Sequence, residues 1–328
     1  MPIKDSILPK RLLNEDFRAR YSQIFMIYLF LILFMLGISF CNGDFLTISN
    51  LKNLLVGAFP LLMAAFAQTL VILTGGIDLS IGGIISVANV SCVACMTRFP
   101  QSAFGCALGV LTAIVSGLLC GLINGLFVTR GRIPSIIVTI ATMTIFEGVA
   151  LYILPVPGGS VHSAFAQFLT GDLFGVPLAL LLLILATVIL RVLTNSTPFG
   201  KALRAVGGNE SAAYSTGIVV WKVELWAYLL AGLFCSFAGI FLAAEMYSGD
   251  PTVGNTFSMN SITATVVGGT LMTGAVGDIL GSIAGVFIIY IINNMLNLLG
   301  VSSYYQFIFQ GLILIFALIT SSLKSQKK

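Results

Sequence analysis

Charged side chains are scarce in this 328-residue chain. Asp, Glu, Lys and Arg together make up 9% of it, whereas soluble globular domains carry about 25%. Hydrophobic residues make up 58%, and the mean hydropathy is +1.04. Because so few polar side chains cannot cover the surface of a water-soluble globule, the composition excludes an ordinary soluble protein. The chain is predicted to be an integral membrane protein.

The residues that many enzymes use for catalysis are also few. His162 is the single histidine, so the chain cannot form a histidine metal cluster, and no Ser/His/Asp series accompanies it. The stretch FGKAL lacks the upstream glycine and the following Ser or Thr of a phosphate-binding loop. Cys92 and Cys95 form a C-x-x-C pair without the second pair that a metal site would need. We therefore expect no metal or cofactor in this chain and disfavour a membrane enzyme.

Long apolar runs are abundant. A helix needs about 20 residues to cross a hydrocarbon core, and runs of that length recur along the whole chain. We expect an all-α, polytopic membrane protein with about ten transmembrane helices. The expected spans are 22–42, 53–74, 79–97, 103–128, 134–154, 174–193, 223–245, 259–275, 277–299 and 304–322. They form a single transmembrane domain over 22–322, with tails at 1–21 and 323–328.

The distribution of basic residues predicts the orientation. If the spans alternate, the two tails lie on one side together with the 129–133 and 194–222 loops. Of the 16 Lys and Arg residues, 14 lie in or directly beside these segments, and only Lys52 and Arg98 lie elsewhere. Since basic residues concentrate on the cytoplasmic side of membrane proteins, both termini are predicted to be cytoplasmic. The net charge of +4 follows from these residues and is no sign of nucleic-acid binding.

Two segments repeat a small residue at every fourth position. The first ridge consists of Gly105, Gly109, Ala113, Gly117, Gly121 and Gly125, and the second consists of Gly277, Gly281 and Gly285. Residues four apart share a helix face, and small residues there let a second helix approach closely within lipid. Both helices are predicted to be buried in a bundle. The pattern fits static packing as well as a smooth surface for helix sliding.

Two glycine-rich stretches interrupt the apolar runs. The first, LTGGIDLSIGG, contains Gly75, Gly76 and Asp78, and we expect the Asp78 carboxylate to cap the helix that follows. The second, VVGGTLMTGAVGDILGSIAG, repeats the theme and leads to the hypothesis of two related halves. Because discontinuous helices often flank the transport path of transporters, Gly75, Gly76 and Asp78 are candidates for that path or its gate.

A few polar side chains fall within the expected spans. Glu147 is an ionisable group at mid-span and therefore a functional candidate, with a neutral or hydrogen-bonded structural carboxyl as an equal alternative. Amide side chains gather towards the C-terminus, at Asn293, Asn294, Asn297, Gln306 and Gln310. They either bond helices to one another or line a wet conduit for a hydroxyl-rich solute. The candidates for the path therefore also include Glu147, Asn293, Asn297 and Gln306.

The polar segment 194–222 separates two long apolar runs. Thr197 followed by Pro198 is typical of a helix N-terminus, and Gly207 is suited to end that helix. A first short helix is therefore predicted at the start of this segment.

A second short helix is predicted directly afterwards. Asn209 is expected to cap a helix from Glu210 to about Thr216, and Gly217 is expected to stop it. The side chains of both helices are too few and too small to form a core. We expect the second helix to dock into a groove of another protein, with a solvated connector as the alternative.

Six stretches between about residues 70 and 310 are specific enough to compare with known families. They are TGGIDLSIGG, INGLFVTRGRIPSIIVTIATM, TPFGKALRAVGGNESAAYSTGI, LAGLFCSFAGIFLAAEMYSGDPTVG, ITATVVGGTLMTGAVGDILGSIAG and NNMLNLLGVSSYYQ. In this order they resemble the permease subunit of ribose-type sugar ABC importers. One departure is MTGAVGD, where members of that family often carry a double glycine before the final glycine.

The resemblance implies a dimeric permease in the bacterial inner membrane, formed with a second copy or a paralogue. It implies a periplasmic or lipoprotein sugar-binding protein outside, and inside a cytoplasmic ABC ATPase that binds ATP and Mg. The family's ATPase-contact segment corresponds here to Arg204, Gly207, Gly208, Asn209, Glu210, Ala212, Ala213 and Gly217.

We therefore expect a permease that moves a monosaccharide inward by alternating access, powered by a separate ATPase. It breaks no substrate bonds, and its path binds sugar weakly so that the cargo is released. The nearest alternative is a permease for another small hydrophilic solute, such as a branched-chain amino acid, a nucleoside or a signalling furanose. A more distant one is an ion-coupled transporter, which would use Glu147 or Asp78 as a proton or sodium site.

Overall fold

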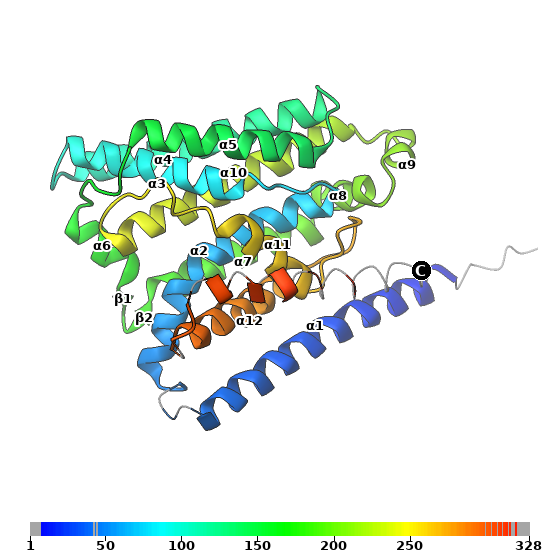
Figure 1. The fold of residues 1–328 in the computed structure, drawn as a ribbon. Coiled ribbons are helices and arrows are strands. Elements are labelled where there is room, and N and C mark those ends of the chain that lie inside the picture. The colour runs from blue at the N-terminus through cyan, green and yellow to red at the C-terminus, as the bar shows by residue number, and fades with distance from the viewer. Residues whose placement is uncertain are drawn as a thin grey trace, which may run out of the picture.

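The fold of the chain is a bundle of helices (Figure 1). The computed structural model describes residues 8–41, 43, 45–298, 300–302, 304–306, 308–309, 311–313, 315 and 319. The helices are α1 (Leu8–Cys41), α2 (Ile48–Leu73), α3 (Ile81–Arg98), α4 (Ala103–Thr129), α5 (Ser135–Ile153), α6 (Ser163–Thr170), α7 (Leu178–Asn195), α8 (Pro198–Gly208), α9 (Glu210–Ser215), α10 (Val220–Met246), α11 (Phe257–Val267) and α12 (Ile279–Leu298). Two short antiparallel strands, β1 (Asp172–Leu173) and β2 (Val176–Pro177), precede α7. The expected helical class is confirmed.

Seven of the described helices are long and apolar enough to cross a membrane. They are α2, α3, α4, α5, α7, α10 and the Ile279–Leu296 part of α12. The expected span at 259–275 differs from the structure, because its helix, α11, ends at Val267. Part of the expected span at 304–322 lies outside the described residues. The chain is a multi-pass membrane protein, and the count of about ten spans stays a prediction.

The second glycine-rich stretch explains why α11 is short. Gly269 and Gly274 have φ angles of +88° and +87°, in the left-handed region that favours glycine and cannot continue a right-handed helix. Gly268 packs so closely on α12 that a Cβ atom there would overlap the Gly281 carbonyl. A Cβ atom on Gly285 would likewise overlap α11. Gly281 and Gly285 of the second ridge are therefore buried against α11 and its end, as a ridge buried in a bundle requires, whereas Gly277 precedes α12 and packs against Thr270.

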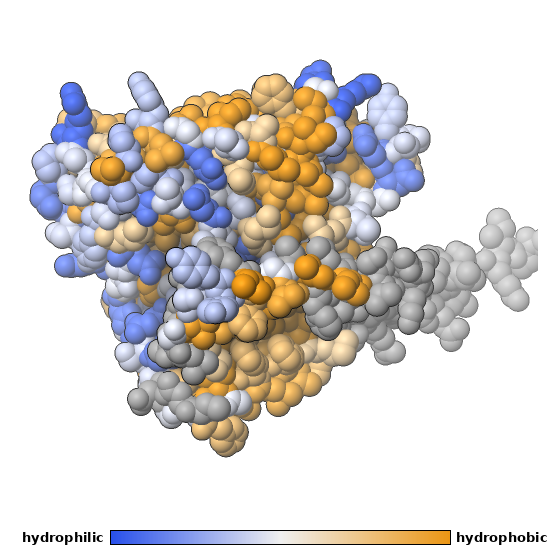
Figure 2. Space-filling view, viewed as in Figure 1, coloured by the Kyte–Doolittle hydropathy of each residue, from blue (hydrophilic) through white to orange (hydrophobic). Residues whose placement is uncertain are grey.

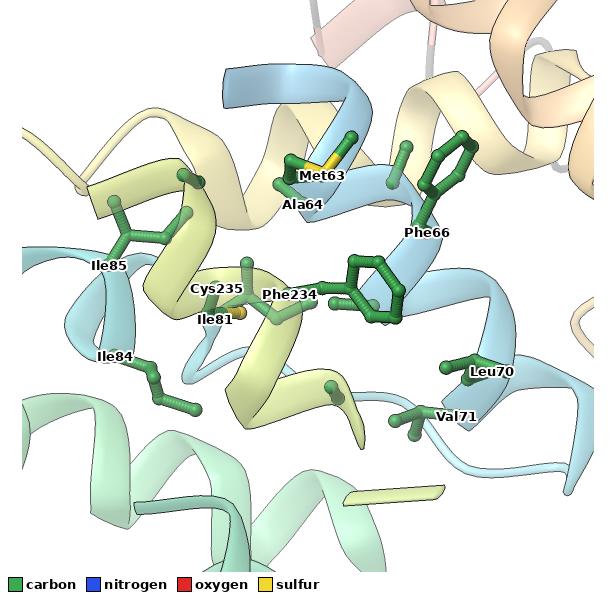
Figure 3. Packing of buried hydrophobic residues seen from close by; sticks show 14 of the residues in the cluster. Met63, Ala64, Phe66, Leu70, Val71, Ile81, Ile84, Ile85, Phe234 and Cys235 are labelled. Carbon is green, nitrogen blue, oxygen red and sulfur yellow. The ribbon is translucent and has the colours of Figure 1, made fainter. Parts of the chain in front are cut away.

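α2, α3 and α10 form the centre of the bundle. In their most apolar windows 83%, 72% and 78% of the residues are buried, against 28% in α4, α5 and α7. Figure 3 shows Phe66 of α2, Ile84 of α3 and Phe234 of α10 in one buried cluster. The rings of Phe66 and Phe234 meet edge to face, with centroids 6.1 Å apart. The outer helices expose many aliphatic side chains, which suits a lipid environment.

Polar residues gather at two ends of the molecule. In Figure 2 hydrophilic residues lie at these ends, and apolar residues cover much of the surface between them. Figure 1 shows α6 and the β1–β2 hairpin at one end, named here the α6 end, and α8 and α9 at the opposite one, the α8–α9 end. An apolar belt between two polar ends is the pattern of a protein whose ends are in water and whose middle is in lipid.

The first small-residue ridge forms the contact between α4 and its two neighbours. A Cβ atom on Gly109 would lie 2.8 Å from a carbonyl oxygen of α3. Gly117 lies against Gly232 of α10, and Gly121 lies against the Tyr228 backbone. The close packing predicted for this ridge is confirmed, although the opposite face of α4 is exposed. A sliding role for the ridge stays a prediction.

The chain between α10 and α11 runs beside α3 without forming a helix. The Asp250 N–H donates to Asn89 Oδ1 (2.9 Å), and the Gly254 N–H donates to Ser86 Oγ (3.0 Å). Asn89 also donates from Nδ2 to a carbonyl of α10 (3.1 Å). Because lipid offers no hydrogen bonds, non-helical backbone needs such partners within the protein. Polar side chains of α3 thus support a non-helical segment that packs on the bundle.

Candidate functional site

α8 begins as the sequence predicts. Thr197 Oγ1 accepts a hydrogen bond from the Gly200 N–H (3.3 Å), and Pro198 lies in the first turn. The same hydroxyl donates to the Leu193 carbonyl in the last turn of α7 (2.6 Å). The helix ends at Gly208, one residue after the expected end at Gly207.

Asn209 separates α8 from α9 and caps the second helix. Its Oδ1 accepts a hydrogen bond from the Ala212 N–H (2.9 Å), as predicted. α9 ends at Ser215, and Gly217 follows with a φ angle of +86°. The cap and the stop that the sequence predicts are both confirmed.

The eight residues predicted to contact an ATPase divide into two groups. The outward group is exposed and consists of Gly208, Asn209, Glu210, Ala212 and Gly217. The inward group is buried or half-buried and consists of Arg204, Gly207 and Ala213. Tyr214, which was not among the eight, is 75% exposed on α9. Its signal in the sequence is a large aromatic residue in a polar segment of small ones.

Gly207 lies where α8 touches the end of α2. A Cβ atom on Gly207 would overlap the Leu73 carbonyl oxygen and would lie 2.7 Å from the Ala275 nitrogen. The Ala275 N–H donates to the same Leu73 carbonyl (3.1 Å). Three chain segments therefore meet at this glycine through their backbones.

Gly274 completes this contact. A Cβ atom on Gly274 would lie 2.6 Å from the Gly207 oxygen and 3.0 Å from Gly75 Cα. We name the contact of residues 73–76, Gly207 and residues 274–277 the glycine junction. The two glycine-rich stretches of the sequence thus lie side by side, and the hypothesis of two related halves stays a prediction.

Arg204 reaches from α8 to two other elements. Its Nη1 donates to the carbonyls of Ala275 (3.2 Å) and Gly277 (2.9 Å). Its Nη2 donates to Asn195 Oδ1 at the end of α7 (3.0 Å). The side chain therefore contacts the backbone and the Asn195 side chain of this same chain.

Asp78 is fully buried in the connection between α2 and α3. Its Oδ1 accepts hydrogen bonds from the Ser80 N–H (2.8 Å) and from Ser80 Oγ (2.6 Å). The expectation that Asp78 caps α3 is wrong in detail, because Ser80 is the N-cap and the short Asp side chain holds the turn before it. Burial raises the pKa of Asp78 to about 6, and hydrogen bonds from Ser80 and Asn124 oppose the rise.

The other path candidates lie outside the glycine junction. Glu147 is half-buried on α5, one of the outer helices. Asn293 is half-buried on α12, and Gln306 donates from Nε2 to the Val301 carbonyl (3.0 Å). The Asn297 side chain lies outside the described part of the chain. A single path that includes these residues stays a prediction.

A cleft of about 1480 Å³ opens at the α8–α9 end. Its walls come from α9, the start of α10 and the connection between α4 and α5, and Gly75 and Gly76 belong to its lining. Arg130 stacks over the Trp221 ring, with Cζ 4.0 Å from the ring centre. In the sequence Arg130 is only one of the basic residues that predict the orientation, because two residues so far apart in the chain give no signal of contact.

Comparisons with known proteins define the class. The family model for the permease component of branched-chain amino acid transport systems matches residues 50–318. The ribose import permease protein of Bacillus subtilis (strain 168) is 38% identical over 301 residues, which cover 91% of this chain and 92% of that protein. The galactose/methyl galactoside import permease protein of Escherichia coli (strain K12) is 34% identical, with 96% and 99% covered.

A third relative shows a comparable identity and coverage. The L-arabinose ABC transporter permease protein of Azospirillum brasilense is 33% identical over 297 residues, which cover 90% of this chain and 86% of that protein. The helical membrane fold and these similarities define a transport permease. The chain belongs to the family of permease components matched over residues 50–318. The resemblance to ribose-type sugar permeases is confirmed.

Proposed function

We propose that this chain is the transmembrane subunit of an ABC importer that moves a monosaccharide into the bacterial cytoplasm. The observation that carries the proposal is similarity over at least 86% of three relatives that are all named for sugars. The family description names branched-chain amino acids instead. Identity of 33–38% to individual sugar permeases over nearly their whole length favours a sugar.

Transport needs partners that supply energy and substrate. A cytoplasmic ABC ATPase binds ATP and Mg and drives alternating access, and a sugar-binding protein delivers the monosaccharide from outside. A second copy of the permease, or a paralogue, completes the membrane part. The path itself binds sugar weakly, since an interaction that holds the ground state tightly would slow release.

The α8–α9 end faces the cytoplasm in this proposal. The support is the positive-inside rule, because this end carries Arg130, Arg132, Lys201 and Lys222. The ATPase then docks on α9, whose exposed side chains include Glu210, Ala212 and Tyr214. A short capped helix that projects from the bundle is suited to insert into a groove of the partner.

The glycine junction is the proposed link between docking and the gate. It joins α8 to the end of α2 and to the turn before α12, beside the cleft at the same end. A movement of α9 on ATP binding would reach these helix ends without passing through long side chains. Gly75, Gly76 and Asp78 are retained as gate candidates for this reason.

Reconstitution tests the proposed function. The permease is placed in vesicles with an ATPase and a sugar-binding protein encoded beside it, and uptake of labelled ribose, arabinose and galactose is measured with and without internal ATP. Leucine serves as the amino acid comparison. We expect uptake of at least one sugar that depends on ATP and on the binding protein. Uptake that follows an ion gradient and ignores ATP, or uptake of leucine alone, would refute the proposal.

A further inference from the structure

We propose that Arg204 is a positioning residue of transport, which keeps α8 and the 274–277 turn together as one rigid unit. A displacement of α8 and α9 then moves the end of α2 and the start of α12 at the same time. This inference rests on the proposed function, in which the ATPase docks on α9. It departs from the expectation that Arg204 contacts the ATPase.

The first argument is the geometry of the guanidinium. Arg204 donates to two carbonyls of the 274–277 turn and to the Asn195 side chain, so one group spans α8, the turn and the end of α7. A planar guanidinium presents several N–H groups in a fixed fork, and a lysine ammonium at one point cannot reproduce that arrangement. Arg204 is half-buried, which limits competition from water.

The second argument is that the junction is made of backbone. Gly207 and Gly274 leave no side chain between α8 and the turn, and the Ala275 N–H binds the Leu73 carbonyl directly. Side chains in a contact can change rotamer and absorb a small shift, whereas closely packed backbones cannot. A shift of α8 is therefore passed on to both neighbours.

The third argument is that the turn is closed on itself and continues into α12. The Leu271 N–H donates to the Val276 carbonyl (2.9 Å), and the Gly274 N–H donates to the Leu271 carbonyl (3.1 Å). Directly after the turn, Asp278 Oδ1 accepts a hydrogen bond from the Leu280 N–H at the start of α12 (2.9 Å). The turn therefore acts as a block that carries the first residues of α12 with it.

The first experiment compares Arg204→Ala with Lys201→Ala in the reconstituted transporter. Lys201 is a matched control, since it is a cation on the same helix and is exposed. For each variant we measure the ATPase retained by the permease, the ATP hydrolysed and the sugar taken up. We expect Arg204→Ala to retain the ATPase and to lose at least tenfold in sugar moved per ATP. Lys201→Ala is expected to stay within twofold of the original chain, and Arg204→Lys to fall between them.

Two outcomes of this experiment overturn the proposal. If Arg204→Ala moves as much sugar per ATP as the original chain, the arginine does not couple the elements. If it loses the ATPase, Arg204 is a docking residue instead. A chain that shows no ATP-dependent uptake before any substitution refutes the proposed function, and the second experiment then decides the role of Arg204 by itself.

The second experiment measures proximity and needs no transport. A Cβ atom on Gly208 would lie 3.6 Å from Ala275 Cβ, and disulfides need about 3.5–4.5 Å between Cβ atoms. Gly208→Cys and Ala275→Cys are introduced together, and oxidative cross-linking in native membranes is quantified by mass spectrometry of the joined peptides. We expect efficient cross-linking with Arg204 present and at least a fivefold lower rate with Arg204→Ala. An unchanged rate would show that Arg204 does not hold the turn to α8.

Discussion

Gly117 of α4 and Gly232 of α10 face each other so closely that a Cβ atom on either would overlap the other helix. Overpacking a site costs roughly 1–3 kcal/mol, and in a chain of this length each kcal/mol lowers the melting temperature by at most about 2–4 °C. We expect Gly232→Ala to lower the melting temperature of the detergent-solubilised protein accordingly. Gly148→Ala on α5, where nothing lies within 4 Å, should not lower it. Equal melting temperatures for the two variants would contradict the contact.

Asn89 supports the non-helical segment before α11, and its replacement should release that segment. Asn89→Leu removes the acceptor of the Asp250 N–H and the donor to the Gly239 carbonyl. An unsatisfied buried polar group costs about 1–3 kcal/mol. We expect lower thermal stability and faster proteolysis after residue 247 than in the control Asn255→Ala, which changes an exposed amide. A proteolysis pattern like that of the original chain would contradict this role.

Stability should depend on pH through Asp78. Its pKa is raised from 3.8 to about 6 in the folded chain, so the folded state holds the proton more tightly than the unfolded state. Stability is then greatest below about pH 4 and falls as the pH rises to about 6. The fall amounts to at most about 3 kcal/mol, since one pKa unit corresponds to about 1.4 kcal/mol.

Asp78→Asn tests this dependence. The amide keeps an acceptor for Ser80 and cannot ionise, so we expect a higher melting temperature than that of the original chain at pH 7.5, a smaller gain at pH 5 and no gain near pH 4. If the original chain and Asp78→Asn respond to pH identically, the carboxyl keeps one protonation state over this range.

The exposed face of α9 should be needed for docking and not for folding. Tyr214→Ala removes a ring that is 75% exposed, and we expect unchanged thermal stability with at least fivefold less ATPase retained in pull-down. Tyr152→Ala is the matched control, because this tyrosine is 88% exposed at the far end of α5. Equal retention by both variants would remove α9 from the docking site. Gly208→Trp is expected to act as Tyr214→Ala does.

Glu147 distinguishes ATP-driven from ion-driven transport. It is half-buried on the outer helix α5, and in an ATP-driven importer it has no ion to carry. We expect Glu147→Gln to change sugar uptake by no more than about threefold, a shift of roughly 0.7 kcal/mol. Complete loss of uptake by a fully assembled complex would favour the ion-coupled alternative.

Features that depend on local sequence could be predicted well. The caps at Thr197 and Asn209 and the stop at Gly217 each follow from chemistry within a few residues, and all three occur as expected. The small-residue ridge of α4 could also be predicted locally, because it follows from small residues at every fourth position of one helix. Patterns of this kind give the position of an element and the face that it buries.

Features that depend on distant parts of the chain could not be predicted. The span at 259–275 contains no charged side chain, so hydropathy does not reveal that α11 stops at Val267. The Arg204 side chain points towards the carbonyls of Ala275 and Gly277, which are about 70 residues away in the chain. α6, with eight residues, and the two-residue strands before α7 are too short to give a periodic signal in the sequence. Hydropathy indicates whether a residue favours lipid or water, and it does not report the conformation of the backbone.

Gly207 has consequences for how this chain tolerates genetic variation. Every other amino acid is larger than glycine, and even the Cβ of alanine would collide there with the Leu73 carbonyl. A saturation library selected for growth on the transported sugar should therefore lose all substitutions at this position, while many survive a few residues later on α9. The position at which substitutions begin to survive would mark where the closely packed part of the permease ends and its contact surface for a partner begins.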